Sequence, residues 1–184
     1  MHFAPDSEES LEFVVALANT VPEASRSGGD ELPDPAALTD LLRRFRYTGR
    51  FDEDAAELAA VLSTRALLRS IWTMARDDAV DATNRMLQDA KALPQLVRHD
   101  AYDWHLHATS PDAPLDERIR VEVGLAFVDV LRTAEWGRLR VCEASDCEGV
   151  LADLSRNGSK RFCSVRCGNR MNTLAFRERA AAPR

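Results

Sequence analysis

The chain has 184 residues, of which 45% are hydrophobic and 29% charged, and it carries a formal net charge of −6. This length and apolar content suit one domain with a sizeable core plus a small appendage. No run of about 18 uncharged apolar residues occurs, which argues against a membrane span. Residues 1–13 are acidic and lack the basic and apolar regions of a secretory signal, so we expect a soluble, cytoplasmic protein.

The first three quarters of the chain have the apolar spacing of amphipathic helices. Ser7 is a candidate N-cap for the first helix, which ends before Pro22, and Thr39 is a candidate N-cap for the second. Pro114 suits the first position of the last long helix in this part. The expected helices cover residues 7–20, 39–45, 53–76, 81–92 and 114–136.

The spacing of apolar residues changes at 95–109, where apolar and polar residues alternate on both sides of Asp100 and Ala101. This pattern predicts a β-hairpin. His105 and His107 would share one face of its second strand. The sequence places no further ligand beside them, so we interpret them as ordinary strand histidines rather than as a second metal site. Residues 1–137 are thus expected to form a mainly α domain with a small β-hairpin.

All four cysteines follow that domain, as Cys142-x4-Cys147 and Cys163-x3-Cys167. Two close pairs separated by a hairpin-length insert are typical of metal ligands, and four thiolates match the tetrahedral preference of zinc. A four-cysteine site has no open position, so the zinc ion would be structural. Two disulfides are the alternative, but they need an oxidising compartment that the chain shows no means of reaching.

The residues around the cysteines predict the rest of the module. Asn157 and Gly158 form a strong hairpin signal between expected strands at 149–154 and 159–163. Ser164 is a good N-cap for a helix over 165–179, and Cys167 would lie in its first turn. A zinc knuckle, a hairpin and a helix that supplies the last ligand make a treble-clef zinc finger.

The positive charge of the chain is concentrated at this end. Residues 156–184 contain 8 basic residues and 1 acidic one, against 16 and 29 in the rest. At about 100° per residue, Arg166, Arg170 and Arg177 lie within about 40° of one another on the helix. Arginine grips phosphate, and arginine and asparagine read base edges. The expected DNA contacts are Lys160, Arg161, Arg166, Asn169, Arg170 and Arg177.

Two alternatives stay open for this basic end. Asn169 and Arg170 would instead buttress the zinc site by hydrogen bonding, or the basic face would meet an acidic protein surface rather than DNA. The charge by itself also fits a merely solvated terminus.

The run from Cys167 to Arg170 resembles the motif that names the CGNR zinc-finger family. The likeness extends back over Leu139 to Cys142, Cys147, Asp153, Ser155 to Asn157 and Arg161 to Ser164. Members often have one more residue between the last two cysteines and a tryptophan where Phe162 stands here. The resemblance implies an N-terminal ABATE domain, here residues 1–137, joined to a finger at 138–184. It also implies a bacterial transcription regulator induced by stress.

The resemblance to the ABATE domain rests on Leu17 to Thr20 and on Thr64 to Arg69. It implies modulation by a small ligand. Arg65 falls on the apolar stripe of the helix expected at 53–76, where an unpaired charge is costly. Its partner would be an internal carboxylate or an anionic effector, with Asn19 as a neighbour. The hypothesis is that Arg65 and Asn19 line a pocket for a carboxylate-bearing ligand.

We therefore expect a zinc-containing regulator that binds duplex DNA and is modulated by a small anionic effector, with a homodimer plausible because one small finger covers little DNA. The alternative is a zinc-stabilised protein–protein interaction module. Catalytic motifs are absent from the sequence, and no histidine follows His107 to serve a treble-clef nuclease, so an enzyme is not expected.

Overall fold

A computed structural model of the chain describes residues 3–25, 27–98 and 103–181. Its helices are α1 (Pro5–Ala18), α2 (Pro35–Arg44), α3 (Ala55–Trp72), α4 (Arg76–Asp89), α5 (Leu115–Arg132) and α6 (Val165–Ala181). Its strands are β1 (Gln95–Val97), β2 (His105–His107), β3 (Leu139–Val141) and β4 (Val150–Ala152). This confirms a mainly helical protein with a small hairpin and a C-terminal finger. No helix among the described residues combines the length and hydropathy of a membrane span.

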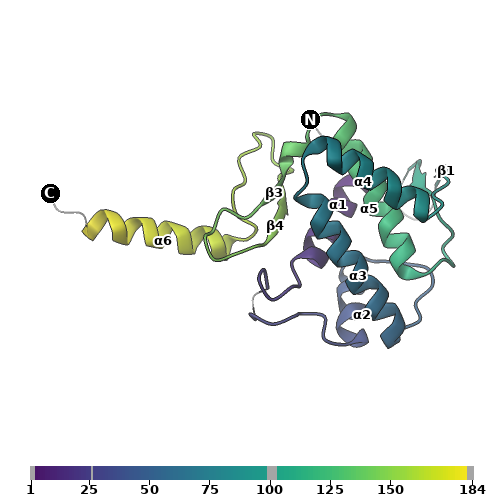
Figure 1. Ribbon diagram of the computed structural model, residues 1–184, viewed down its shortest axis with the longest axis horizontal. Coiled ribbons are helices and arrows are strands. Elements are labelled where there is room, and N and C mark those ends of the chain that lie inside the picture. Colours follow the sequence, from purple (N-terminus) through teal and green to yellow (C-terminus); the bar gives the residue numbers. More distant parts are fainter. Residues whose placement is uncertain (1–2, 26, 99–102, 182–184) are drawn as a thin grey trace.

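The molecule consists of a helical body and a projecting arm (Figure 1). Helices α1 to α5 gather in the body, whereas α6 extends away from it at the opposite end from the β1–β2 hairpin. Strands β3 and β4 lie between the two parts. The arm is therefore attached to the body through the β3–β4 hairpin.

The starts of several helices differ from the prediction, because prolines and aspartates set them. Helix α1 begins at Pro5, so Ser7 lies inside it rather than at its N-cap. Asp34 and Asp54 cap α2 and α3, and their carboxylates accept first-turn backbone N–H groups at 2.9 and 2.8 Å. Thr39 is therefore an interior residue of α2. The helix expected at 53–76 ends at Trp72, and α4 follows after a short break.

The body is organised around α5, which packs against α1, α3 and α4. Phe127 of α5 is fully buried, and its ring lies edge-on to Trp72 at 5.9 Å and to Trp136 at 5.6 Å. Such aromatic pairs contribute beyond the apolar area that they bury. Trp72 and Trp136 are therefore core residues, whereas Trp104 is 62% exposed.

The first hairpin has the predicted position. Strands β1 and β2 pair antiparallel, with Gln95 opposite His107 and Leu96 opposite Leu106. The expected turn at Asp100 and Ala101 lies outside the described residues.

The second hairpin differs from the prediction. Strand β4 pairs with β3, which precedes the first cysteine, and not with residues 159–163. Gly158 does adopt a turn conformation with φ +58°, but the chain beyond it forms no strand. The reason is burial: Leu139, Val150 and Ala152 enter the core of the body, whereas Ser159, Lys160 and Arg161 have no apolar side chain to place there. The zinc knuckle itself thus closes the hairpin.

Side chains of the body also hold this hairpin through its backbone. The Asn19 amide, just after α1, donates to the carbonyl of Val150 at 2.9 Å and accepts from the N–H of Val150 at 2.7 Å. The Arg69 guanidinium joins the carbonyls of Ala18 and Glu148, at 2.8 and 3.1 Å. Through these bonds the end of α1 and the face of α3 fix the orientation of the finger.

Replacing Asn19 with alanine will weaken this attachment. Val150 is 1% exposed, so both of its backbone groups would lose their partner in a buried place. We expect the free energy of unfolding to fall by about 2 kcal/mol in a urea titration. Asn172→Ala, on the exposed surface of α6, is the control and should change it little. Equal effects of the two substitutions would contradict a role for Asn19 in docking the finger.

Candidate metal centre and basic helix

The four cysteine sulfurs converge on one point. Their Sγ atoms all lie within 4.8 Å of one another, and none of the four cysteines is in a disulfide. The Cys147 and Cys163 sulfurs are 3.6 Å apart, and those of Cys163 and Cys167 are 3.7 Å apart. A tetrahedral zinc ion with Zn–S bonds of about 2.3 Å requires sulfurs about 3.8 Å apart. The four cysteines therefore form a structural zinc site.

Backbone N–H groups point at the sulfurs of this site. The N–H of Gly149 lies 3.4 Å from the Cys147 sulfur, and that of Cys163 lies 3.4 Å from the Cys142 sulfur. A Cβ atom at Gly149 would come within 2.8 Å of the Cys163 sulfur, so only glycine fits there. These donors favour thiolate charge and shape the knuckle around the metal.

The start of α6 supplies the last ligand, as predicted. The Ser164 hydroxyl oxygen accepts the N–H of Cys167 at 3.2 Å, which is the geometry of an N-cap. Cys167 lies in the first helical turn and is buried. The shorter spacing between the last two cysteines is therefore compatible with the helix start.

Burial opposes the ionisation of two of the ligands. Removal from water raises the pKa of Cys147 and, more strongly, that of Cys163, where the neighbouring sulfurs act in the same direction. Without a cation these thiols therefore keep their protons at neutral pH. A bound zinc ion reverses the balance, and its binding releases protons.

Arg170 touches the metal centre. One of its Nη atoms donates to the Asp146 carboxylate at 2.5 Å and to the Cys167 sulfur at 3.7 Å. Asp146 precedes the ligand Cys147 in the knuckle, so the ion pair ties α6 to the first cysteine pair. These contacts favour the buttressing alternative for Arg170. The Asn169 side chain, in contrast, is exposed on the helix.

The other predicted DNA-binding residues lie on the surface of the finger. Arg161 pairs with Glu143 at 2.5 Å, with both side chains largely exposed. Lys160, Arg166 and Arg177 are also exposed. Lys160, Arg166 and Arg177 are thus accessible, whereas Arg161 and Arg170 are engaged in ion pairs with Glu143 and Asp146.

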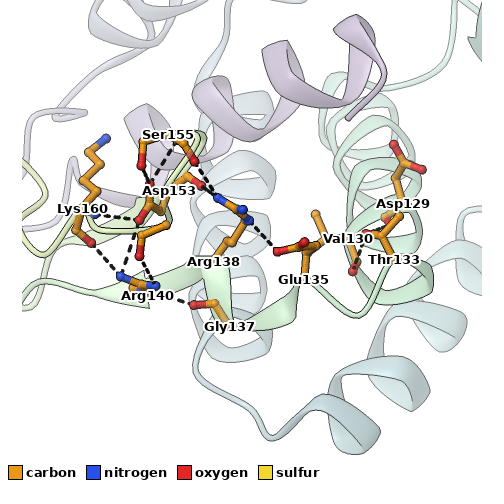
Figure 2. A network of polar contacts seen from close by, with 11 residues as sticks. Asp129, Val130, Thr133, Glu135, Gly137, Arg138, Arg140, Asp153, Ser155 and Lys160 are labelled. Atoms are coloured by element: carbon orange, nitrogen blue, oxygen red, sulfur yellow. Dashed lines mark hydrogen bonds and ion pairs between the residues drawn. The ribbon is translucent and has the colours of Figure 1, made fainter. Parts of the chain in front are cut away.

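A polar network shapes the loop between β4 and Cys163 (Figure 2). The Asp153 carboxylate is 0% exposed, and it accepts from the N–H and hydroxyl of Ser155 at 3.1 and 2.5 Å and from the N–H of Lys160 at 2.7 Å. Burial alone would raise the pKa of Asp153, but the hydrogen bonds from Ser155 and Lys160 hold it below its usual value.

Two arginines complete this network. Arg138 donates to the carbonyls of Asp153 and Ser155 at 3.0 and 2.8 Å, and Arg140 donates to those of Gly158 and Lys160 at 2.8 and 3.1 Å. Sequence reasoning did not assign these two arginines a role. The sequence signal for this network is the Asp-x-Ser turn motif at 153–155. It indicates a local bond between the Asp153 carboxylate and the backbone, but it does not indicate that Arg138 and Arg140 take part.

The predicted ligand site at Arg65 and Asn19 needs correction. The Arg65 guanidinium binds both oxygens of Asp30, at 2.9 and 2.6 Å, and the Thr20 hydroxyl at 2.8 Å. The hydrogen bond from Arg65 lowers the pKa of Asp30, against the effect of its burial. Asn19 is engaged with Val150. Neither residue lines either of the two main cavities of the described residues, and of the two partners expected for Arg65 the structure shows the internal carboxylate, Asp30.

Comparison with protein families gives two matches. Residues 11–134 match the ABATE family, described as "Putative stress-induced transcription regulator". Residues 138–180 match the CGNR zinc finger. Comparison with curated proteins gives no significant match.

Removing the metal will unfold the knuckle and α6 and spare α1 to α5. We expect a chelator, or Cys163→Ser, to expose the remaining thiols to a cysteine reagent and to make the basic end sensitive to trypsin, because few apolar contacts replace the ion. Ser159→Ala, an exposed position of the same segment, is the control. Unchanged thiol reactivity and proteolysis after chelation would contradict a structural metal.

Replacing Asp153 with asparagine will loosen the loop without changing its size. The buried carboxylate accepts several N–H and O–H groups, and charged hydrogen bonds of this kind contribute about 1.5–3 kcal/mol each. We expect a loss of about 2 kcal/mol in the free energy of unfolding, and faster amide exchange at Ser155 and Lys160. Asp40→Asn, an exposed position on α2, should change neither. Slow exchange retained in Asp153→Asn would contradict this role.

Proposed function

Since the chain belongs to the ABATE family and ends in a CGNR zinc finger, we propose that it is a transcription regulator that binds duplex DNA through the finger. The observation that carries the proposal is the placement of α6. It projects from the body as an arm that no other element covers in Figure 1. From Asn172 to Leu174 and from Phe176 to Ala181 its side chains are exposed. A free helix of this kind has the dimensions to enter the major groove.

Electrostatics support this orientation. Residues 156–184 carry 8 basic side chains against 1 acidic one, and the rest of the chain is acidic. A zinc ion with four thiolates has a net charge of −2, which leaves the arm cationic. The phosphate backbone would therefore attract the finger and repel the body, so one end of the molecule faces the duplex.

The residues have different roles within this proposal. Arg166 and Arg177 lie on one stripe of α6, and Lys160 lies on the loop that Asp153 holds; these are the phosphate-contacting candidates. Asn169 is the base-reading candidate, because its amide is exposed on the helix. Arg170 acts first through the zinc site, since its guanidinium is engaged with Asp146 and Cys167.

The biological setting is proposed from the family and from the sequence. It comprises a bacterial, cytoplasmic regulator that responds to stress, acts without catalysis and is modulated by a small ligand in the N-terminal domain. A homodimer on two half-sites remains a prediction, because one finger buries little DNA surface.

A second function, a protein-interaction module, is favoured by one feature of α6. Val165, Leu174 and Phe176 are 80%, 40% and 66% exposed on the helix. Apolar side chains of this size serve a protein interface better than a phosphate backbone. The basic stripe would then face an acidic partner.

Salt dependence separates the two functions. We expect fluorescence anisotropy with a labelled duplex and the zinc-loaded full chain to give a binding constant that falls steeply as salt rises, by about 0.9 in log K per decade for each phosphate contact. Arg177→Ala should reduce the slope of log K against log salt concentration by the amount of about one phosphate contact. Duplex binding that does not change with salt, or no binding to the duplex even at low salt, would favour the protein partner.

Arg179→Ala is the matched control for that titration. It removes the same charge from the same helix turn, but from a position about 160° around the helix from Arg177. Its slope should stay close to that of the unchanged protein. Equal losses for the two variants would show that net charge, rather than the stripe, governs the binding.

A further inference from the structure

A cavity of about 390 Å³ opens on the side of the body between α1, the chain after α2, β2 and α5. This volume is within the range of small-molecule sites. It is not the place where the sequence suggested a ligand, since neither Arg65 nor Asn19 lines it. Neither the zinc site nor the basic helix contributes to it.

One wall of the cavity is aromatic. Phe13 of α1 packs against Phe45 with ring centroids 5.3 Å apart and against Tyr47 at 4.7 Å. Phe13 is buried, whereas Phe45 and Tyr47 are half-buried. The aromatic groups that line the cavity thus come from both α1 and the end of α2. Aromatic faces attract cations through their quadrupole.

The charged groups around that wall are mostly carboxylates. Asp6 and Glu9 line the cavity from α1, and Glu122 lines it from α5. On the other side, Arg46 lines the cavity with an exposed side chain, and the imidazoles of His105 and His107 line it from β2. The local charge therefore disfavours an anion and favours a cation.

Glu122 and Tyr47 meet inside the cavity. Burial raises the pKa of Glu122, although the nearby Tyr47 hydroxyl and Arg118 charge oppose the shift. Burial, followed by the charge of Glu122, raises the pKa of Tyr47. The Tyr47 hydroxyl is buried beside the Glu122 carboxylate. These two groups form a polar end of the cavity.

We propose that the cavity binds a small organic cation, an amine or quaternary ammonium group on an aromatic or apolar body. Glu9 would offset the charge, and so would Glu122, because a cation bound beside it favours its ionised form against the effect of burial. Phe13, Phe45 and Tyr47 would contact the body of the ligand. A metal ion fits less well, because the cysteine cluster is the only group of three or more potential ligands that converges in the described part of the chain.

The cavity also adjoins the helix that leads to the attachment point of the finger. Helix α1 lines it with its first three turns, and the residue that follows the same helix, Asn19, holds strand β4 of the finger. An occupant would therefore touch the helix that anchors the DNA-binding module. The inference names a chemical class for the small ligand that the proposed function places in the N-terminal domain, but binding of this ligand does not depend on DNA binding.

Isothermal titration calorimetry of the zinc-loaded full chain with benzyltrimethylammonium tests the proposal without DNA. We expect saturable binding of this cation, weaker binding of benzyl alcohol and none of benzoate. Glu122→Gln should lower the affinity for the cation by about tenfold or more, which is the loss expected for one charged contact in a buried site. Phe45→Leu removes an aromatic ring and leaves the carboxylates of the cavity in place, and it should also weaken binding of the cation.

Glu117→Gln is the matched control, because it removes a carboxylate of the same helix that lines a different cavity. Its affinity should equal that of the unchanged protein, and thermal unfolding should verify that all three variants are folded. Benzoate binding as tightly as the cation, no heat with the cation at millimolar concentration, or equal affinities of Glu122→Gln and Glu117→Gln would each overturn the proposal. A failure here would leave the DNA titration unaffected.

Discussion

The convergence of four sulfurs on one point is the constraint on which the C-terminal part depends. Residues 153–164 contain no regular secondary structure, and α6 contributes only Cys167 as a buried side chain. A segment with so little buried apolar surface does not fold by hydrophobic burial alone. A structural zinc ion contributes about 10–16 kcal/mol of apparent binding free energy, which replaces the missing core. The ion therefore decides whether a basic helix exists.

The body and the metal divide the task of holding the finger. The body holds the β3–β4 hairpin by burying Leu139, Val150 and Ala152 and through the amide of Asn19. The metal holds the knuckle and α6, with Arg170 and Asp146 as a bridge between them. The two modules thus share a core at the hairpin, and α1 takes part both in that attachment and in the wall of the side cavity.

Sequence reasoning recovered the features that depend on spacing and composition. The cysteine pattern, the helices of the body and the hairpin at 95–107 are of this kind, because metal coordination and amphipathic periodicity are local. The predicted pairing of β4 with residues 159–163 was wrong. The Asn157–Gly158 turn is a local preference, whereas burial against the body decided the pairing. An internal carboxylate was expected as one of two partners of Arg65, but its identity as Asp30 and the role of Asn19 were not predicted, because they depend on residues 35 and 131 positions away, which no spacing rule reaches.

Zinc K-edge X-ray absorption of the purified full chain tests the tetrathiolate centre most directly. One zinc ion per chain with four sulfur neighbours at about 2.3 Å is the predicted result. A first shell with nitrogen or oxygen ligands, or a zinc content well below one ion per chain in fully folded protein, would contradict it.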